Sequence, residues 1–544
     1  MNDQPKSIWR REILPELFIF RWSRWFFGWL VSWRGVRRIL IVLAWTATII
    51  GLFYAEENWR GRRAWNKYRQ ELEARGEQLD LKALIPKPIP EDQNFAATPF
   101  VQSWFVRTND IWNDNYSKAA EMLDTSKKDP SRRHFADLAG LERAFTYMAS
   151  GKFDADLTRK RGHLEPTDMR RFKPGDEALD SRAKAAPAVL EGLRDREAVL
   201  EELRGASRRP YARYPVVYDL ENPWGILLPH LASVKASCVR LDLRACAELA
   251  AGQSEKALED VKLMLYLADS LKGEPFLISH LVRLACLQLG VRTAWEGLAE
   301  HRWSEAQLQE LQGRFQQYDL LADVQLPLAT ERAAGVLTAD LLARGKYNLS
   351  DLGDSGTQHS SGGTGLPGLI SKFIPRGWYY LEQLNYCRLY QMQLGGTFDA
   401  GKKRVFPDRI QSNFHELERE FGPPQLGTLL HHRVVGALLL PALGNVIRNT
   451  SRAQTAIDQA AIACALERYR LARGQFPEKL DSLAPQFISH LPTDILADGP
   501  YKYRRTDDGQ FVLNSVGWDE KDHGATHGEI PSEDKARVWV WQYP

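Results

Sequence analysis

One apolar stretch without a charged residue, Ile39 to Tyr54, limits what this chain can fold into more than any other feature of its sequence. It is slightly shorter than the ~20 residues that an α-helix needs to cross the hydrocarbon core of a bilayer. Arg37 and Arg38 can extend the span, because arginine side chains reach from the apolar region towards the membrane surface. We therefore predict a transmembrane helix over residues 37–54. A buried helix of a soluble protein and a cleaved signal peptide are the alternatives.

Basic residues are concentrated ahead of this stretch. Residues 1–38 contain eight Lys and Arg against three Asp and Glu, whereas the net charge of the whole chain is +3. These eight outnumber the five basic residues between Arg60 and Arg69. The positive-inside rule then places the N-terminus in the cytoplasm and residues 55–544 outside, as in a bacterial inner (cytoplasmic) membrane protein. The rest of the chain has no basic excess, so we expect no nucleic-acid partner.

The segment 1–36 also carries an aromatic stripe, which we predict to be an interfacial helix on the cytoplasmic side. A helix with large aromatic residues along one face suits the headgroup layer of a membrane. The alternative is a stripe that packs against a partner helix within the membrane. The residues that recur at this spacing are Trp22, Trp25, Phe26, Trp29 and Trp33.

The remaining chain has the composition of a folded protein rather than of a multi-span membrane protein, with 44% hydrophobic and 26% charged residues. Its 544 residues exceed what one hydrophobic core normally holds. We predict a mainly α-helical chain with an irregular helical-hairpin body. After the span we expect a juxtamembrane helix and Pro-rich spacer (55–99), a helical body (100–345), a flexible Gly/Ser loop (346–375), a helical support region (376–450) and a small C-terminal α+β domain (451–544).

Helical periodicity is clearest between Ala232 and Phe315. Within it, Ala251-Gly252-Gln253 separates two apolar-periodic segments, and this arrangement resembles a tetratricopeptide-type helical hairpin. Ser304 can cap a further helix, because its hydroxyl can accept a hydrogen bond from the first turn. No regular ~34-residue repeat is visible, so we expect an irregular stack of hairpins. Such a surface either binds peptides or proteins or serves as a scaffold without a ligand.

Short motifs elsewhere do not identify a chemistry. His415 begins a zinc-protease pattern, but Arg419 stands where the second histidine ligand would have to be. Gly363, Gly365 and Gly368 match a dinucleotide-loop pattern, but a polar linker rather than a strand precedes them. The cysteines are widely spaced without a CxxC pair, so we predict core residues rather than disulfides or a metal site. They are Cys238, Cys246, Cys286, Cys387 and Cys464.

The C-terminal domain gives the most specific fold signal. An amphipathic stretch from Thr455 to Ala472 predicts a helix, which Gly474 ends as a C-cap. Tyr501–Tyr503 and Phe511–Leu513 predict two strands, and Asp507-Asp508-Gly509 predicts the turn between them. We therefore expect one long helix followed by a small antiparallel sheet.

This domain resembles the soluble domain of the major pseudopilins of type II secretion systems. The resemblance covers roughly a sixth of the chain. Pseudopilins carry their apolar segment at the start of the long helix, whereas the apolar segment here lies far upstream, so the domain is expected on a different anchor rather than in a pilus subunit. The residues that match the family pattern are Tyr469, Gly474, Pro477, Leu480, Leu483, Pro485, Leu491, Pro492, Asp494, Tyr501, Tyr503, Asp508, Gly509, Ser515, Gly517 and Asp519.

The resemblance also implies a calcium site. In pseudopilins the loop after the last strand holds calcium, and the corresponding positions here are Asp519, Asp522 and Asp534, with a backbone carbonyl near Ser515. Calcium prefers hard oxygen ligands in a flexible loop. The family's Gly-rich loop sequence is not kept, and Lys521 could neutralise the loop instead. The alternative to calcium is a loop held by the packing of Trp518, Trp539 and Trp541.

Together these features predict a single-pass, membrane-anchored envelope protein that acts as a non-enzymatic scaffold or assembly factor. Its expected partners are the membrane, through residues 37–54, and proteins of unknown identity, with a secretion-type machine as the candidate assembly. The alternative is a membrane-tethered hydrolase with a carboxylate site in the helical body. We favour the scaffold, because no catalytic constellation is visible in the sequence.

Overall fold

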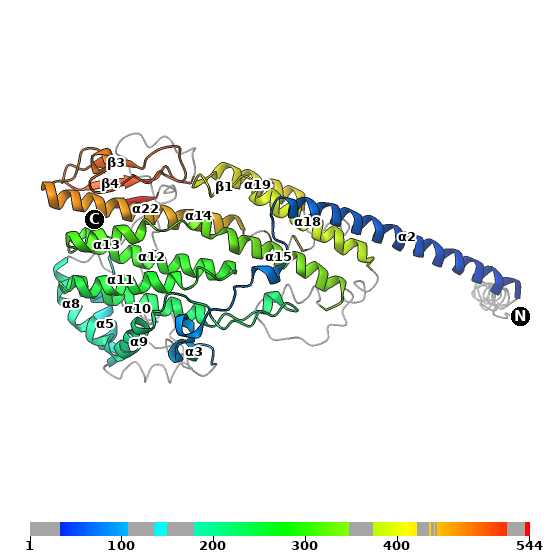
Figure 1. The fold of residues 1–544 in the computed structure, drawn as a ribbon, viewed down its shortest axis with the longest axis horizontal. Coiled ribbons are helices and arrows are strands. Elements are labelled where there is room, and N and C mark those ends of the chain that lie inside the picture. Colours follow the sequence, from blue (N-terminus) through cyan, green and yellow to red (C-terminus); the bar gives the residue numbers. More distant parts are fainter. Residues whose placement is uncertain are drawn as a thin grey trace, which may run out of the picture.

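A computed structural model describes residues 33–106, 135–149, 179–346, 374–421, 433, 435–436, 440, 443–518 and 539–543. The described chain is mainly helical, and one long apolar N-terminal helix extends away from a body of packed helices with a few small strands (Figure 1). This confirms the predicted mainly α architecture with an N-terminal apolar helix. The aromatic stripe before Trp33 and most of the predicted Gly/Ser loop lie outside the described residues.

Helix α2 (Trp33–Ala74) contains the predicted span and the predicted juxtamembrane helix in one uninterrupted element. At a rise of 1.5 Å per residue, its 42 residues extend over about 63 Å. The large apolar side chains between Leu40 and Phe53 are exposed by 47–66%. Within the described ranges, α2 is the one helix long and apolar enough to span a membrane. The helix continues past Tyr54 because no proline interrupts the sequence there.

The second half of α2 packs against α18 (Arg376–Leu394), beside which it lies in Figure 1. A buried stripe faces α18 at intervals of about one helical turn. The opposite face of the second half of α2 is exposed and polar. Near Glu57 the helix therefore changes from one whose apolar side chains are exposed on all sides to an amphipathic helix. The buried residues of the stripe are Glu57, Gly61, Trp65 and Leu72.

Two glycines let the backbones of α2 and α18 approach closely, and we call this contact the α2–α18 joint. A Cβ atom at Gly61 would collide with the carbonyl oxygen of Gly377, and one at Gly377 would collide with the carbonyl oxygen of Glu57. Polar contacts fix the register of the joint. The backbone N–H of Gly377 donates to Asn58 Oδ1 at 2.6 Å, and Trp378 Nε1 donates to Glu57 Oε2 at 3.1 Å.

Helix α15 (Gln325–Ala343) packs against α18 as well. Tyr386 and Tyr390 of α18 donate their hydroxyl protons to the backbone carbonyls of Glu331 and Leu328, at 3.1 and 2.6 Å. Arg332 of α15 pairs with Glu77, just beyond the end of α2. Helix α2 is therefore tied to the body by packing, hydrogen bonds and an ion pair.

The helical hairpins predicted for the body are present. Helices α10 (His230–Ala250) and α11 (Ser254–Asp269) are joined by a short turn in which Gly252 adopts a φ of +75°. That conformation favours glycine, as a helix stop requires. Helix α12 (Leu277–Ala299) packs on both, and α13 (Glu305–Phe315) begins with the capping box of Ser304. All five cysteines are buried and free, in agreement with the predicted core residues.

Buried ion pairs connect α12 with α8 and with α10. Arg182 of α8 (Leu179–Gly192) contacts Glu296 of α12 at 2.6 Å, and the two side chains are exposed by only 1% and 0%. Asp242 of α10 pairs with Arg292 and also accepts from Thr293 at 2.7 Å. Removing one partner of such a pair leaves a buried charge and costs about 3–5 kcal/mol. These pairs therefore fix which helices pack together.

The other described elements complete the body. Short 3₁₀ turns occur at Leu81–Leu84, Glu91–Gln93, Phe95–Ala97, Arg194–Arg196, Pro223–Gly225 and Leu480–Leu483. The remaining helices are α3 (Pro99–Ser103), α5 (Leu138–Ala149), α9 (Glu197–Ala206), α14 (Leu320–Asp323) and α19 (Pro407–Phe421).

The C-terminal part consists of α22 (Leu443–Arg473) and an antiparallel three-stranded sheet in the order β3-β4-β5. Strands β3 (Lys502–Arg505) and β4 (Phe511–Asn514) form the predicted hairpin. The third strand, β5 (Val540–Gln542), was not predicted, and it pairs Trp541 with Leu513. The predicted helix is also longer than expected, since it starts at Leu443.

One hydrophobic core continues from the helical hairpins into the sheet. Helix α22 packs on α12, α13 and α14, and Gln459 on α22 donates to the backbone carbonyls of Leu513 and Trp539 at 3.3 and 2.8 Å. Trp295 of α12 donates its indole N–H to the carbonyl of Gln542 at 2.9 Å. In Figure 1 α22 accordingly lies between the green helices and the strands. The described residues of the C-terminal part thus share their core with the body.

We expect Gly377→Ala to loosen the α2–α18 joint, because the added Cβ would collide with the backbone of Glu57. Overpacking of this kind destabilises by about 1–3 kcal/mol. The measurement is the thermal unfolding midpoint of the full chain in detergent. Gly313→Ala is the matched control, because Gly313 lies within α13 and a Cβ there meets no atom within 4 Å. A midpoint for Gly377→Ala at or above that of the control would contradict the close contact.

Candidate functional site

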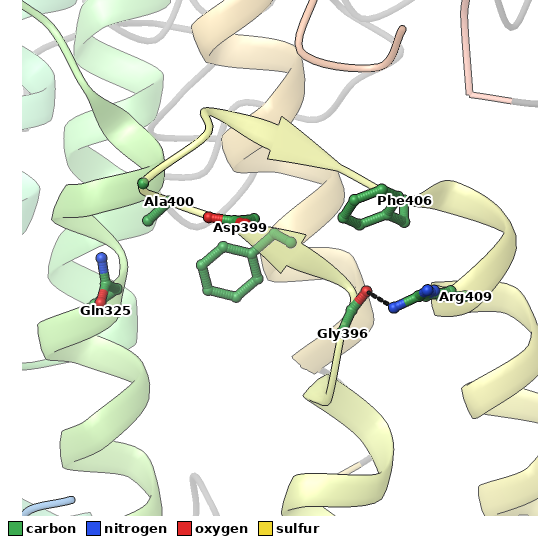
Figure 2. Close-up of a pocket in the computed structure, with 8 residues that line it drawn as sticks. Gln325, Gly396, Asp399, Ala400, Phe406 and Arg409 are labelled. Carbon is green, nitrogen blue, oxygen red and sulfur yellow. Dashed lines mark hydrogen bonds between the residues drawn. The ribbon is translucent and has the colours of Figure 1, made fainter. Parts of the chain in front are cut away.

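A surface pocket of about 600 Å³ lies between α15, α19 and a small hairpin. Figure 2 shows Gln325 of α15 on one side, a small hairpin in the middle and Arg409 of α19 on the other side. The pocket is open to solvent and combines two aromatic rings, a carboxylate and a guanidinium group. Its lining residues are Gln325, Gly396, Phe398, Asp399, Ala400, Gly401, Phe406 and Arg409.

The hairpin that forms the pocket consists of β1 (Phe398–Asp399) and β2 (Arg404–Val405). Its turn is closed locally, because Asp399 Oδ1 accepts from the backbone N–H of Lys402 at 3.0 Å. Strands of two residues are too short to be stable alone, so tertiary contacts must hold them.

Contacts on both sides supply that support. Lys403 Nζ contacts Asp319 at the start of α14 at 3.0 Å, and Arg404 contacts Asp498 at 2.5 Å. The backbone N–H of Val405 donates to the carbonyl of Ile495 at 2.8 Å. The hairpin is therefore attached to the body at one point and to the C-terminal part at two others.

Phe406 is placed between two cations. The guanidinium carbons of Arg404 and Arg409 lie 5.3 and 5.1 Å from its ring centroid, and Arg409 Nη1 donates to the carbonyl of Gly396 at 3.3 Å. Such an arrangement offers an apolar surface for a side chain and a charged donor for a carboxylate. Among the eight lining residues there is no Ser, Thr, Cys or His nucleophile.

A second polar centre lies between α22 and the sheet. Asp494 is 2% exposed and accepts hydrogen bonds from Ser515 Oγ, Val516 N and Leu496 N at 3.0, 2.8 and 3.1 Å. Burial raises the pKa of Asp494 above its ordinary value, although these donors favour the charged form. Asp494 therefore joins the loop before β3 to the chain that leaves β4, a local structural role that the match to the pseudopilin pattern did not specify.

A neighbouring carboxyl group, Asp458 on α22, has a stronger shift. Tyr501 Oη donates to its Oδ2 at 3.0 Å, and Gln454 Nε2 donates to its Oδ1 at 2.9 Å. Burial raises the pKa of Asp458 to about 7, and these two donors oppose the change. At neutral pH Asp458 is therefore divided between its charged and neutral forms.

The predicted calcium ligands Asp519, Asp522 and Asp534 lie outside the described residues. The structure does describe the chain on both sides of them. The backbone N–H of Ser515 donates to the carbonyl of Trp539 at 3.1 Å, and the rings of Trp518 and Trp539 lie 6.1 Å apart. In the described part of the chain, no group of three or more His, Cys, Asp or Glu side chains could hold a metal ion.

Sequence reasoning did not predict the pocket. Seven of the eight lining residues lie within residues 396–409, and Gln325 of α15 completes the pocket from a distant part of the chain. The one local signal is Asp399 followed by Gly401, a turn composition between apolar residues. His415 lies exposed on α19, 3.3 Å from Glu418, and takes no part in the pocket.

Comparisons with protein-family models, with curated proteins and with solved structures find no match to this chain.

We expect Asp458 to make the stability of the protein depend on pH. Its pKa is about 7 in the folded state and ~4 in the unfolded chain, so the folded state binds the proton more tightly between these values. The free energy of unfolding then falls as pH rises through this window. At pH 8 Asp458→Asn should have a free energy of unfolding roughly 1–3 kcal/mol higher than wild type, and therefore a higher unfolding temperature. At pH 4 the two proteins should differ little.

The comparison is made by thermal unfolding of the full chain at both pH values. Asp481→Asn is the control, because Asp481 is an exposed carboxylate in the turn Leu480–Leu483. An equal response of the two variants at pH 8 would show that Asp458 is not the group responsible.

Proposed function

We propose that this protein is a single-pass membrane scaffold that holds a protein-binding surface at a fixed position relative to the bilayer. The main support for this proposal is that α2 continues without interruption from its exposed apolar half into the α2–α18 joint. A tethered enzyme needs only a flexible linker after its membrane segment. A scaffold that fixes the position of a binding surface needs a rigid connection, such as a continuous helix. The charge distribution supports a bacterial inner-membrane protein with its N-terminus inside and its body outside.

The pocket supports binding of a protein segment. An extended peptide could place an apolar side chain against Phe398 and Phe406 and a carboxylate against Arg409. Because the hairpin contacts both the body and the C-terminal part, a peptide in the pocket would lie at the boundary of the two. We therefore take an acidic or C-terminal peptide of a partner protein as the best-fitting occupant.

The C-terminal part supports a link to a secretion-type assembly. Its long helix and the β3–β4 hairpin have the order of the pseudopilin soluble domain. Asp494, one of the matching residues, is buried and accepts three hydrogen bonds. We propose that this pseudopilin-like unit is a docking module fused to the body rather than a pilus subunit.

We further propose that calcium closes the segment between β4 and β5. Asp519, Asp522 and Asp534 are the ligands implied by the resemblance, and residues 519–538 contain six Asp and Glu against three Lys and Arg. Trp518 and Trp539 bring the ends of this segment together. Closing its base in this way would reduce the conformational entropy that binding has to overcome.

A membrane-tethered hydrolase is the second candidate, because burial raises the pKa values of Asp458 and Glu331 to about 7, within the range of acid–base groups. However, Asp458 lies on α22 and Glu331 on α15, and neither is among the residues that line the pocket. Asp399 is the single carboxylate there. Because the two carboxyl groups with raised pKa values lie on different helices and outside the pocket, we favour the scaffold over catalysis by a pair of carboxylates.

We expect calcium to raise the thermal unfolding midpoint of the full chain relative to chelator, and Asp519→Ala to abolish the rise. A ligand at a hundred times its dissociation constant stabilises by about 2.7 kcal/mol. Asp507→Ala is the control, because Asp507 is an exposed carboxylate in the β3–β4 turn. No calcium effect in wild type, with the protein folded in both conditions, would leave the segment held by packing alone.

Binding at the pocket can be tested by placing a photo-crosslinking amino acid at Ala400 in living cells. We expect an adduct with a partner protein that Arg409→Glu reduces at least tenfold, because the change reverses the charge offered to a carboxylate. Arg419→Glu should keep the adduct, since Arg419 is exposed on the same helix outside the pocket. Adducts that are equal in the two variants, or absent from wild type, would exclude peptide docking at this pocket.

A further inference from the structure

The length of the apolar part of α2 fixes where the membrane surface meets the helix. A span of ~20 residues is needed to cross the hydrocarbon core. A span of that length that begins at Arg38, whose side chain reaches the nearer surface, ends near Glu57, three residues beyond the predicted limit at Tyr54. The following residues 58–63 rise about 9 Å along the helix, which is close to the thickness of one headgroup layer, ~5–8 Å.

The start of α18 lies at the same depth. Gly377 contacts the backbone of α2 at Glu57 and Gly61, so the α2–α18 joint itself is level with the headgroups. Arg376, the first residue of α18, is exposed beside the joint. The body therefore meets the membrane surface directly, without a spacer between them.

Basic residues surround the joint at this depth. Four arginines face two carboxylates, Glu56 and Glu57, which gives a net charge of +2. Glu57 is already paired with Arg60 at 2.7 Å. In the described part of the chain no carboxylate pairs with the other three arginines. We name as the headgroup collar Trp59, Arg60, Arg62, Arg63 and Arg376.

Two cations of the collar are oriented by aromatic rings rather than by carboxylates. The guanidinium carbon of Arg63 lies 5.2 Å from the ring centroid of Trp59, and that of Arg62 lies 5.8 Å from Tyr380. An aromatic face orients an arginine without neutralising its charge, so most of its N–H donors stay available for phosphate oxygens. Trp59 is itself 59% exposed, as expected for a tryptophan at a membrane surface.

From this depth, charge and orientation we infer that the headgroup collar binds anionic phospholipid headgroups on the side of the membrane that carries the body. The negative phosphate oxygens accept hydrogen bonds from Arg62 and Arg63, and Arg376 adds charge from α18. Because these side chains come from both helices of the joint, a bound lipid would connect α2 to the body. The binding site is independent of the peptide pocket and of the calcium segment.

The test titrates phosphatidylglycerol into the full chain in nonionic detergent and follows the thermal unfolding midpoint. We expect a saturable rise that phosphatidylcholine does not reproduce. Replacing Arg62 and Arg63 together by glutamine should weaken the apparent affinity for phosphatidylglycerol by roughly 30-fold, about fivefold for each arginine near an anionic surface. The midpoint without lipid should change little, since both side chains are exposed.

The matched control replaces Lys67 and Arg69 by glutamine. These two residues are also exposed on α2 but lie about 8 Å further along the helix, close to one Debye length at ordinary salt concentrations. Their loss should change the apparent affinity less than threefold. An equal loss of apparent affinity for phosphatidylglycerol in the two double variants would show a diffuse charge effect and would contradict a specific site at the headgroup collar.

Two further titrations separate the sources of negative charge. Inorganic phosphate that reproduces the rise would assign the collar to a free anion, and polyglutamate that reproduces it would assign the collar to an acidic protein segment. Either result, or a rise with phosphatidylcholine equal to that with phosphatidylglycerol, would overturn the lipid proposal.

Discussion

The burial of α22 between the helical body and the small sheet is the constraint on which the rest of this structure depends. Between Leu443 and Glu467 most of its residues are buried, on the sides facing both neighbours. Small side chains such as Ala460, Ala461 and Ala463 allow this close packing. Several polar side chains within the buried stretch are hydrogen-bonded, as Gln459 shows towards the strands. Neither the body nor the sheet has a complete core without this helix.

The ion pairs of the hairpins impose a different kind of constraint. Hydrophobic packing tolerates alternative helix partners of similar size, whereas a buried arginine has to meet its carboxylate. Arg182 of α8 pairs with Glu296 of α12. Asp242 of α10 pairs with Arg292 and accepts a hydrogen bond from Thr293, both on α12. This explains how an irregular stack without a regular repeat can still adopt one arrangement. The binding surface that we propose depends on that arrangement, because α15 and α19 reach the pocket from separate parts of the chain.

Sequence reasoning succeeded where an apolar period continues without interruption. It predicted the long apolar N-terminal helix, the α10–α11 hairpin with its stop at Gly252 and the β3–β4 hairpin, because local composition is sufficient in each case. It did not predict β5, which pairs with β4 across 25 intervening residues, nor the two-residue strands of the β1–β2 hairpin. Their stability comes from tertiary contacts that no short window of sequence contains. The pocket was missed for the same reason, and Asp519, Asp522 and Asp534 remain a prediction.

In the membrane placement that we propose for α2, the continuity of this helix gives bilayer thickness a role in how the protein presents its surface. A transmembrane helix responds to a thinner or thicker hydrocarbon core by changing its tilt. In a protein with a flexible linker that change would stop at the membrane. Here the glycine contact and hydrogen bonds of the joint transmit it to the body. In this proposal the height and angle of the pocket above the lipid depend on membrane composition, and two membranes of unequal thickness would present the same protein differently to a partner.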